Sequence, residues 1–168
     1  NAVVCVAGDV THDEVVSRIE ELLGDWEPAT PRPWHPAQEV TPDGRVGVGY
    51  RKTEQAHFYV GAPGLSLHHP DRYTLDMLNT ALGEGMSSRL FLELREKQGL
   101  VYDVHSGTSH LTDCGSTVVS AGTDPKRARQ ALHAILVEME RLTQEVTPEE
   151  LHRAKELSKG RLHLRMEE

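Results

Sequence analysis

The sequence is poor in cysteine: its 168 residues include only Cys5 and Cys114, and no Cys-x-x-Cys pair occurs. Zinc sites built from paired cysteines are therefore not expected. Each cysteine lies in an apolar or strand-like segment, which is typical of buried thiols. A disulfide between the two stays open, because its geometry cannot be judged from spacing.

Long apolar runs and an excess of basic residues are also missing. No run approaches the roughly 18 apolar residues that a membrane helix needs, so we expect no membrane span. The formal net charge is −8. Phosphates of nucleic acids or anionic lipids would repel such a chain, and neither is an expected partner. Solubility is a sufficient reason for the acidic balance.

No signal peptide is visible, and the sequence begins at Asn1 inside a strand-like pattern without a methionine. Residues 165–168 likewise interrupt a helical pattern. We interpret the chain as a fragment of a larger protein, so the missing targeting signal leaves the compartment open. A bacterial-type cytoplasm or periplasm is the expectation. The length allows one compact domain with a short appendage.

Proline divides the chain near its N-terminus. Residues 2–7 form a valine-rich run that is typical of a buried strand, and a capping box with a helical apolar stripe follows over 11–24. Residues 27–44 hold five of the nine prolines, which predicts a stiff linker because proline lacks the donor that helices and sheets use. We therefore expect a strand–helix unit at 1–26 and a main domain at 45–168.

In the main domain, strand patterns and helix patterns each occur in neighbouring pairs. Alternating apolar residues predict strands at 46–50, 58–62, about 101–110 and 116–121, the last two as a hairpin. Helical spacing and start signals predict helices that begin near Asp71, Ser87, Thr123 and Thr147. This order predicts an α+β fold, with an antiparallel sheet and helices packed on one of its faces.

The most informative stretch runs from Gly83 to Ser106. It reads as a loop, a short helix, a stop and a strand, and the apolar stripe of the helix is Leu90, Phe91 and Leu94. Arg95 lies in the last turn, where a cation suits the helix dipole. Gly99 follows as the predicted C-terminal cap.

This stretch resembles the insulinase/pitrilysin family of zinc metallopeptidases, which includes the mitochondrial processing peptidase and core subunits of the respiratory cytochrome bc complex. The resemblance rests on Gly85–Phe91, Leu94–Lys97 and Gly99–Tyr102, and it extends to Val6–Val10 and Thr147–Leu151. It implies the fold of one processing-peptidase-like metallopeptidase half, the half without zinc. Residues 1–26 would be the tail of the preceding homologous half, and residues 45–168 a non-catalytic domain truncated at its C-terminus.

Zinc is expected outside this chain. The family's catalytic half carries His-x-x-Glu-His on a helix, where two imidazoles share one face and the glutamate acts on a bound water. Neither that string nor His-Glu-x-x-His occurs among the ten histidines. The sequence also lacks a Gly-x-Ser-x-Gly elbow for a serine nucleophile and the lysine of a phosphate loop. We expect no cofactor in the fragment and zinc in the missing half of its parent.

The resemblance aligns Arg95 and Tyr102 with an arginine–tyrosine pair that many family members use to reach the peptide held at the zinc of the other half. A guanidinium and a phenol can both donate to peptide carbonyls. Structural roles stay open for both residues. Arg95 can simply interact favourably with the helix dipole, and Tyr102 can pack with Val104 as a strand residue.

We expect the sheet face opposite the helices to line the peptide chamber. The candidates are Tyr102, Ser106 and Thr108 on one parity of their strand, with His57 and Tyr59 from a neighbouring strand. Parity also places His105 and His110 on opposite faces. It does not reveal which face is which, because both faces of residues 101–110 mix apolar and polar residues.

The leading hypothesis is a non-catalytic half that encloses and positions peptide substrate for proteolysis at zinc. Its partners would be that peptide and a zinc-bearing homologous domain or subunit. The alternative is a structural, assembly or companion subunit with no proteolytic role of its own.

A further expectation concerns the incomplete sheet, which exposes an edge that can pair with another strand. Residues 2–7 would fill that edge in the same chain, or in a second copy as a strand-swapped homodimer.

Overall fold

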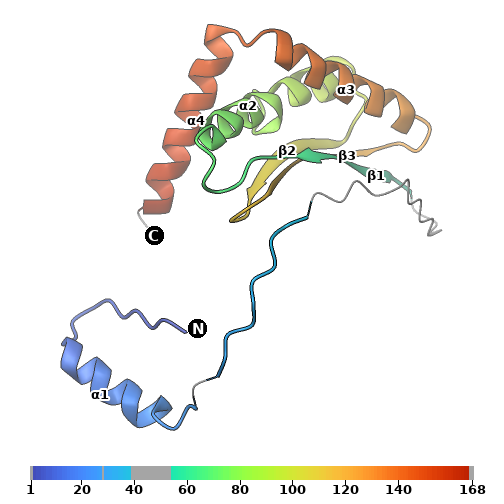
Figure 1. Ribbon diagram of the computed structural model, residues 1–168. Coiled ribbons are helices and arrows are strands. Elements are labelled where there is room, and N and C mark those ends of the chain that lie inside the picture. The colour runs from blue at the N-terminus through green and yellow to red at the C-terminus, as the bar shows by residue number, and fades with distance from the viewer. Residues whose placement is uncertain (1, 28, 39–53, 167–168) are drawn as a thin grey trace. The chain divides into compact units, whose positions relative to one another are not determined.

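The computed structural model describes residues 2–27, 29–38 and 54–166 (Figure 1). The chain divides into two compact units, residues 1–36 and 37–168, and each is described by itself.

The first unit contains one helix, α1 (His12–Leu23), which starts where the sequence predicts, although no side-chain capping hydrogen bond forms at Thr11. Thr11 takes the extended N-cap conformation, and its hydroxyl donates to Glu14 at 2.7 Å. Residues 2–7, by contrast, form no strand and are exposed, Val3 by 89%. The prediction of a buried strand is wrong here. A strand must pair its backbone N–H and C=O groups with a neighbour, and the described part of this unit holds no other strand.

The sheet of the second unit contains three described strands: β1 (Ala56–Pro63), β2 (Asp103–His110) and β3 (Gly115–Thr123). Their order is β1-β3-β2, and both pairings are antiparallel. A turn in which Leu111 N–H donates to the Cys114 carbonyl (2.9 Å) joins β2 to β3, so the predicted hairpin is confirmed. The predicted strand at 58–62 is confirmed within β1, and the one predicted at 46–50 lies outside the described residues.

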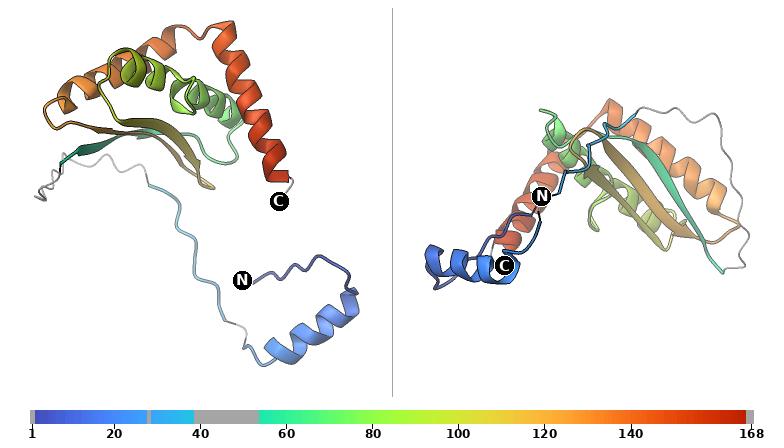
Figure 2. Two further views of the ribbon diagram at one scale, coloured as in Figure 1. Left: turned by 180° about the vertical axis from the view of Figure 1, so that it is seen from behind. Right: turned by 60° about the horizontal axis from the view of Figure 1, so that its bottom comes forward.

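The helical segments of residues 54–166 are α2 (Arg72–Gly83), η1 (Phe91–Lys97), α3 (Ala128–Gln144) and α4 (Pro148–Met166). Figures 1 and 2 show α2 and α3 lying over one face of the sheet and α4 running along the end of α2. None of these helices covers the other face. The predicted α+β architecture, with helices on one side of an antiparallel sheet, is confirmed.

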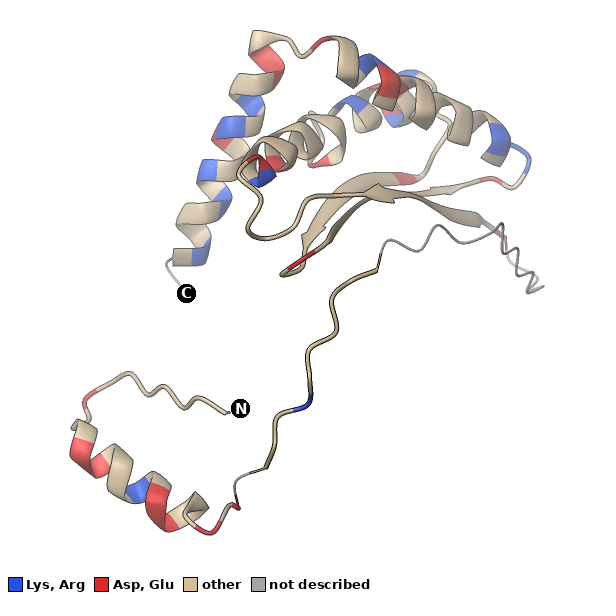
Figure 3. Ribbon diagram, viewed as in Figure 1, with Lys and Arg blue, Asp and Glu red and all other residues tan. Residues whose placement is uncertain are grey.

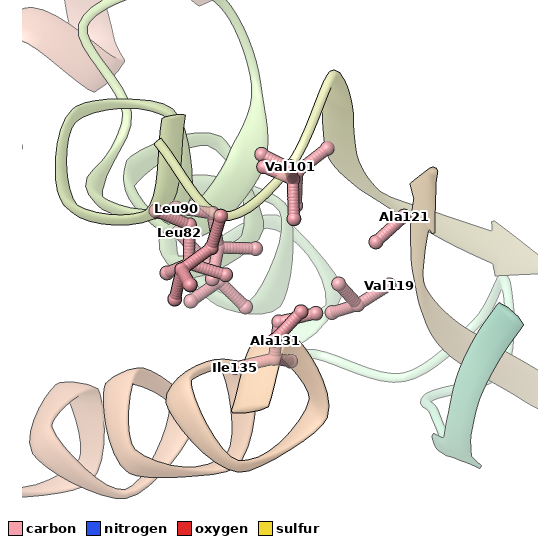
Figure 4. Packing of buried hydrophobic residues seen from close by; sticks show 10 residues of the cluster. Leu82, Leu90, Val101, Val119, Ala121, Ala131 and Ile135 are labelled. Atoms are coloured by element: carbon pink, nitrogen blue, oxygen red, sulfur yellow. The ribbon is translucent and has the colours of Figure 1, made fainter. Parts of the chain in front are cut away.

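The core lies between that face and the helices (Figure 4). Its fully buried side chains include Leu90, Leu94, Val119 and Ile135, and burying each of them contributes about 1.5–3 kcal/mol. The helix α2 approaches β2 closely at Gly83, where an added Cβ would lie 2.5 Å from the Ser106 hydroxyl. Glycine is thus required there for space.

An ion pair ties the start of the η1 segment to the start of α4. Arg89 donates to both carboxylate oxygens of Glu150, and also to the Glu145 carbonyl (2.5 Å). Thr147 and Glu150 exchange the two hydrogen bonds of the predicted capping box. The hydrogen bonds from Arg89, and next those from Thr147, lower the pKa of Glu150 to about 2. Both charged side chains are only 13% exposed, so water competes little with this link between the two elements.

Candidate functional site

Arg95 lies on a helical segment that is wider than an α-helix. η1 is a π-helix, and at its end Gln98 N–H donates to the Glu93 carbonyl, five residues back (3.2 Å). Such turns are frequent at functional sites. Arg95 is exposed, and its guanidinium carbon stands 4.9 Å from the centre of the Phe91 ring. Within the described part of the chain it makes no ion pair, so its N–H donors remain available.

Gly99 turns the chain back after this segment, as its position predicts. Its φ of +57° is left-handed, a conformation that glycine adopts without strain. Leu100 N–H then donates to the Leu94 carbonyl (2.8 Å), and Arg127 donates to the Gly99 carbonyl (2.8 Å). The hydrogen bond between Leu94 and Leu100 holds the residue before Arg95 against the chain that leads to Tyr102.

Tyr102 stands just before β2. Its N–H donates to the Gly122 carbonyl of β3 (2.8 Å), and its side chain belongs to a residue that is 57% exposed. Its neighbours Val101 and Val104 are buried. More than half of the surface of Tyr102 therefore lies outside the core. Both residues of the expected pair are accessible to a ligand.

Two residues expected on the chamber wall face the helices instead. Ser106 donates to the Asn79 carbonyl (3.2 Å), and Thr108 donates to Asp76 (2.7 Å), both on α2. The expectation for Ser106 and Thr108 is wrong because α2 supplies acceptors for their hydroxyls. Polar side chains can then lie on the helix side, and parity alone could not reveal this.

His110 is on the same helix-facing side, opposite His105, as parity predicts. Its Nε2 lies 3.0 Å from Asp76 Oδ1, and its Nδ1 lies 2.6 Å from the Leu65 carbonyl. Both partners are acceptors, so only the protonated imidazole can donate to both at once. The hydrogen bond to Asp76, followed by the one to Leu65, raises the pKa of His110.

The open face of the sheet carries His57 and Tyr59, as expected, together with residues that the sequence did not single out for it. The register places His57, Gly122 and Asp103 in one row across the three strands, and Tyr59, Ser120 and His105 in the next. These six residues line a shallow hollow. Strand alternation could have found Asp103 and His105, but only the pairing with β3 brings them beside His57 and Tyr59.

Zinc does not fit the described residues. Within residues 2–27, 29–38 and 54–166, no group of three or more His, Cys, Asp or Glu side chains is arranged to hold a metal ion. A catalytic zinc site needs about three protein ligands.

The comparison with protein families decides the family of this chain. The family model described as the peptidase M16 inactive domain matches residues 1–158. The chain belongs to the peptidase M16 family, as an inactive domain. No helix in the described part of this M16 domain is both long and apolar enough to cross a bilayer.

Curated relatives of the M16 domain are named zinc proteases. The chain is 41% identical over 159 residues to an uncharacterised zinc protease of Streptomyces coelicolor, covering 90% of this chain and 35% of that protein. It is 33% identical over 171 residues to the uncharacterised zinc protease YmxG of Bacillus subtilis, covering 98% of this chain and 40% of that protein. The chain thus spans well under half the length of these relatives.

Solved structures agree with the fold. A protease from Helicobacter pylori matches with a TM-score of 0.74 and 26% identity, over 96% of this chain and 40% of that one. A peptidase M16 inactive domain from Pseudomonas fluorescens matches with a TM-score of 0.62 and 26% identity, over 64% of this chain and 27% of that one.

Proposed function

We propose that this chain is the non-catalytic half of a zinc-dependent metalloendopeptidase. It encloses a peptide and positions it for cleavage at zinc held by the homologous half. Membership of the M16 inactive-domain family and the zinc-protease names of its relatives support this reading. Residues 1–26 would then be the tail of the preceding half, residues 27–44 a linker, and residues 45–168 the non-catalytic domain.

The observation that carries the proposal is the exposure of Arg95 and Tyr102 on either side of the Gly99 turn. The Phe91 ring lies against the Arg95 guanidinium. A planar guanidinium and a phenol can donate to neighbouring carbonyls of an extended peptide. Donors fixed beside the scissile bond raise turnover by orienting the substrate for attack.

The test uses the full-length protein, in which this chain accompanies the zinc-bearing half. We expect Arg95→Ala and Tyr102→Phe each to lower kcat/KM for a peptide by roughly ten- to a hundredfold, because a misplaced substrate loses about that factor. Bound zinc should be unchanged. Arg95→Lys should recover little, since an ammonium lacks the planar fork.

Lys97→Ala is the matched control, because Lys97 is an exposed cation on the same segment and pairs only with Glu93 in the described residues. Its turnover should equal that of the wild type. Unchanged turnover and unchanged peptide affinity in the Arg95 and Tyr102 variants would leave a structural or assembly role.

A further inference from the structure

The hollow on the open face combines unusual features for a sheet surface. Asp103 is the only Asp, Glu, Lys or Arg in β1, β2 and β3. Figure 3 shows the contrast between these strands and the helices, which carry most of the charged residues of the unit. No Lys or Arg of the described chain lines the hollow. The carboxylate of Asp103 is thus the one Asp, Glu, Lys or Arg side chain among the residues that line the hollow.

Polar contacts hold the floor of the hollow in place. His105 Nδ1 lies 3.3 Å from Asp103 Oδ2, and His105 Nε2 lies 2.8 Å from the Ser120 hydroxyl. Ser120 is itself buried on the sheet surface. The carboxylate of Asp103 stays more than half exposed and can accept further hydrogen bonds.

A glycine shapes one wall of the hollow. The ring of His57 occupies the space above Gly122, and a Cβ at Gly122 would lie 3.1 Å from His57 Cε1. The imidazole therefore crosses the central strand toward Asp103, its partner across the row. Tyr59 completes the hollow with a phenol that is 75% exposed, and its ring face can attract a cation.

The neighbouring row leaves room for a polypeptide backbone. Gly61 and Gly107 flank Val118 across the sheet. A Cβ built at either glycine would meet no atom within 4 Å. Glycine within a strand is typical of a site where another backbone approaches closely. The carbonyl of Gly122, the residue that lies under the His57 ring, also accepts a hydrogen bond from the N–H of Tyr102. The hollow therefore adjoins Tyr102, one of the two proposed peptide-contact residues.

We infer that this hollow binds a basic side chain of the peptide substrate, with Asp103 as the specificity-determining residue. The inference rests on the proposed function. A guanidinium or ammonium would donate to the Asp103 carboxylate and lie against the Tyr59 ring. The backbone of the peptide would pass over the row of Gly61, Val118 and Gly107.

The test uses the full-length protein and pairs of peptides that carry either arginine or citrulline, its uncharged isostere, at one position after another. We expect one position at which the arginine peptide has about threefold higher kcat/KM, the size expected for a partly exposed ion pair. Asp103→Asn should bring that ratio to one, and Asp103→Glu should restore part of it. Asp113→Asn, which removes a carboxylate from the turn at the far end of the same hairpin, should leave the ratio unchanged.

Two outcomes would overturn the inference: a ratio of one at every position in the wild type, or a ratio that survives Asp103→Asn. Because the readout is a ratio, an Asp103→Asn variant with lower overall turnover still gives an answer. If the Arg95 and Tyr102 variants lose turnover while the ratio is one throughout, the hollow has no such role and the proposed function stands. If those variants keep full turnover, the proposed function fails. In that case, fluorescence anisotropy measures the affinity of the same peptides, carrying a label, for the full-length protein. Tighter binding of the arginine peptide that is lost in Asp103→Asn would support the role of the hollow, and equal binding of the two peptides would refute it.

Discussion

Single exposed residues in this domain make contacts that leave their hydrogen-bonding atoms accessible to solvent. Arg95 rests on Phe91 from its own helical segment, which uses the ring face and spares the N–H donors. Gly99 supplies the left-handed turn that separates Arg95 from Tyr102. The sequence alone predicts the turn, because it depends on local chemistry, whereas the pairing of Arg95 with Tyr102 as substrate contacts follows only from the family resemblance. The sequence does not predict that Arg95 and Tyr102 are exposed, because exposure depends on how distant parts of the chain pack around them.

His110 gives a prediction about pH. Its raised pKa means that protonation favours the folded state. The contribution of His110 should therefore be complete below its unfolded pKa of about 6.5, and it should vanish as the pH rises through the folded pKa. We expect His110→Gln to destabilise the chain at pH 5.5 and to have less effect at pH 8.5, measured by urea unfolding.

His133→Gln is the control for this experiment, since His133 is an exposed histidine on α3. It should show no such pH dependence. An effect of His110→Gln that is equal at the two pH values would refute the proposed charge-assisted hydrogen bonds to Asp76 and Leu65.

Contacts between elements decide how the helices sit on the sheet. The Arg89–Glu150 pair joins the η1 segment to α4, and the pKa of Glu150 near 2 lies below the ordinary value of 4.5. The stabilising effect of the ionised carboxylate is present above about pH 4.5 and is lost as the pH falls toward about 2. We expect Glu150→Gln to lower the free energy of unfolding at pH 7 by about 2–3 kcal/mol.

The difference between Glu150→Gln and the wild type should shrink steadily in chemical unfolding between pH 4.5 and pH 2. Glu149→Gln, one residue earlier and exposed, should change the stability little at any pH. A pH-independent effect of Glu150→Gln would show that packing, and not charge, makes the contact.

The close contact between α2 and β2 leads to a prediction about the stability of glycine variants. Gly83→Ala would push a methyl group into the backbone N and hydroxyl of Ser106, and we expect a loss of about 1–3 kcal/mol from overpacking. Gly160→Ala in α4 meets no atom within 4 Å. It should add about 0.5–1 kcal/mol, because alanine favours a helix. Thermal unfolding gives the melting temperatures of the two variants, which should fall for Gly83→Ala and rise for Gly160→Ala. Equal shifts in melting temperature would contradict the close contact at Gly83.

Element types were predictable where local signals agree. The start of α1 after Thr11, the capping box at Thr147 and the hairpin of β2 and β3 all follow from the sequence. The side of the sheet that Ser106 and Thr108 occupy was not predictable, since it depends on acceptors that α2 supplies from a distant part of the chain. The hollow was missed for a similar reason, because it needs the register of three strands.

For the chain as a whole, the pairing of residues 2–7 with a sheet edge stays a prediction, because within their own unit these residues form no strand. If they fill the edge of an incomplete sheet, their amide protons should be protected from hydrogen exchange, whether they pair within one chain or in a swapped dimer. A sizing column would distinguish the two routes. Rapid exchange at Val3, Val4 and Val6 would exclude both.

In the proposed function, this domain binds the peptide while the homologous half cleaves it. The most direct measurement is a structure of the full-length protein, stripped of zinc, with a peptide trapped between its halves. We expect the Arg95 guanidinium and the Tyr102 hydroxyl within about 2.6–3.2 Å of peptide carbonyl oxygens. A peptide bound at the catalytic half with both groups pointing into solvent would contradict the account.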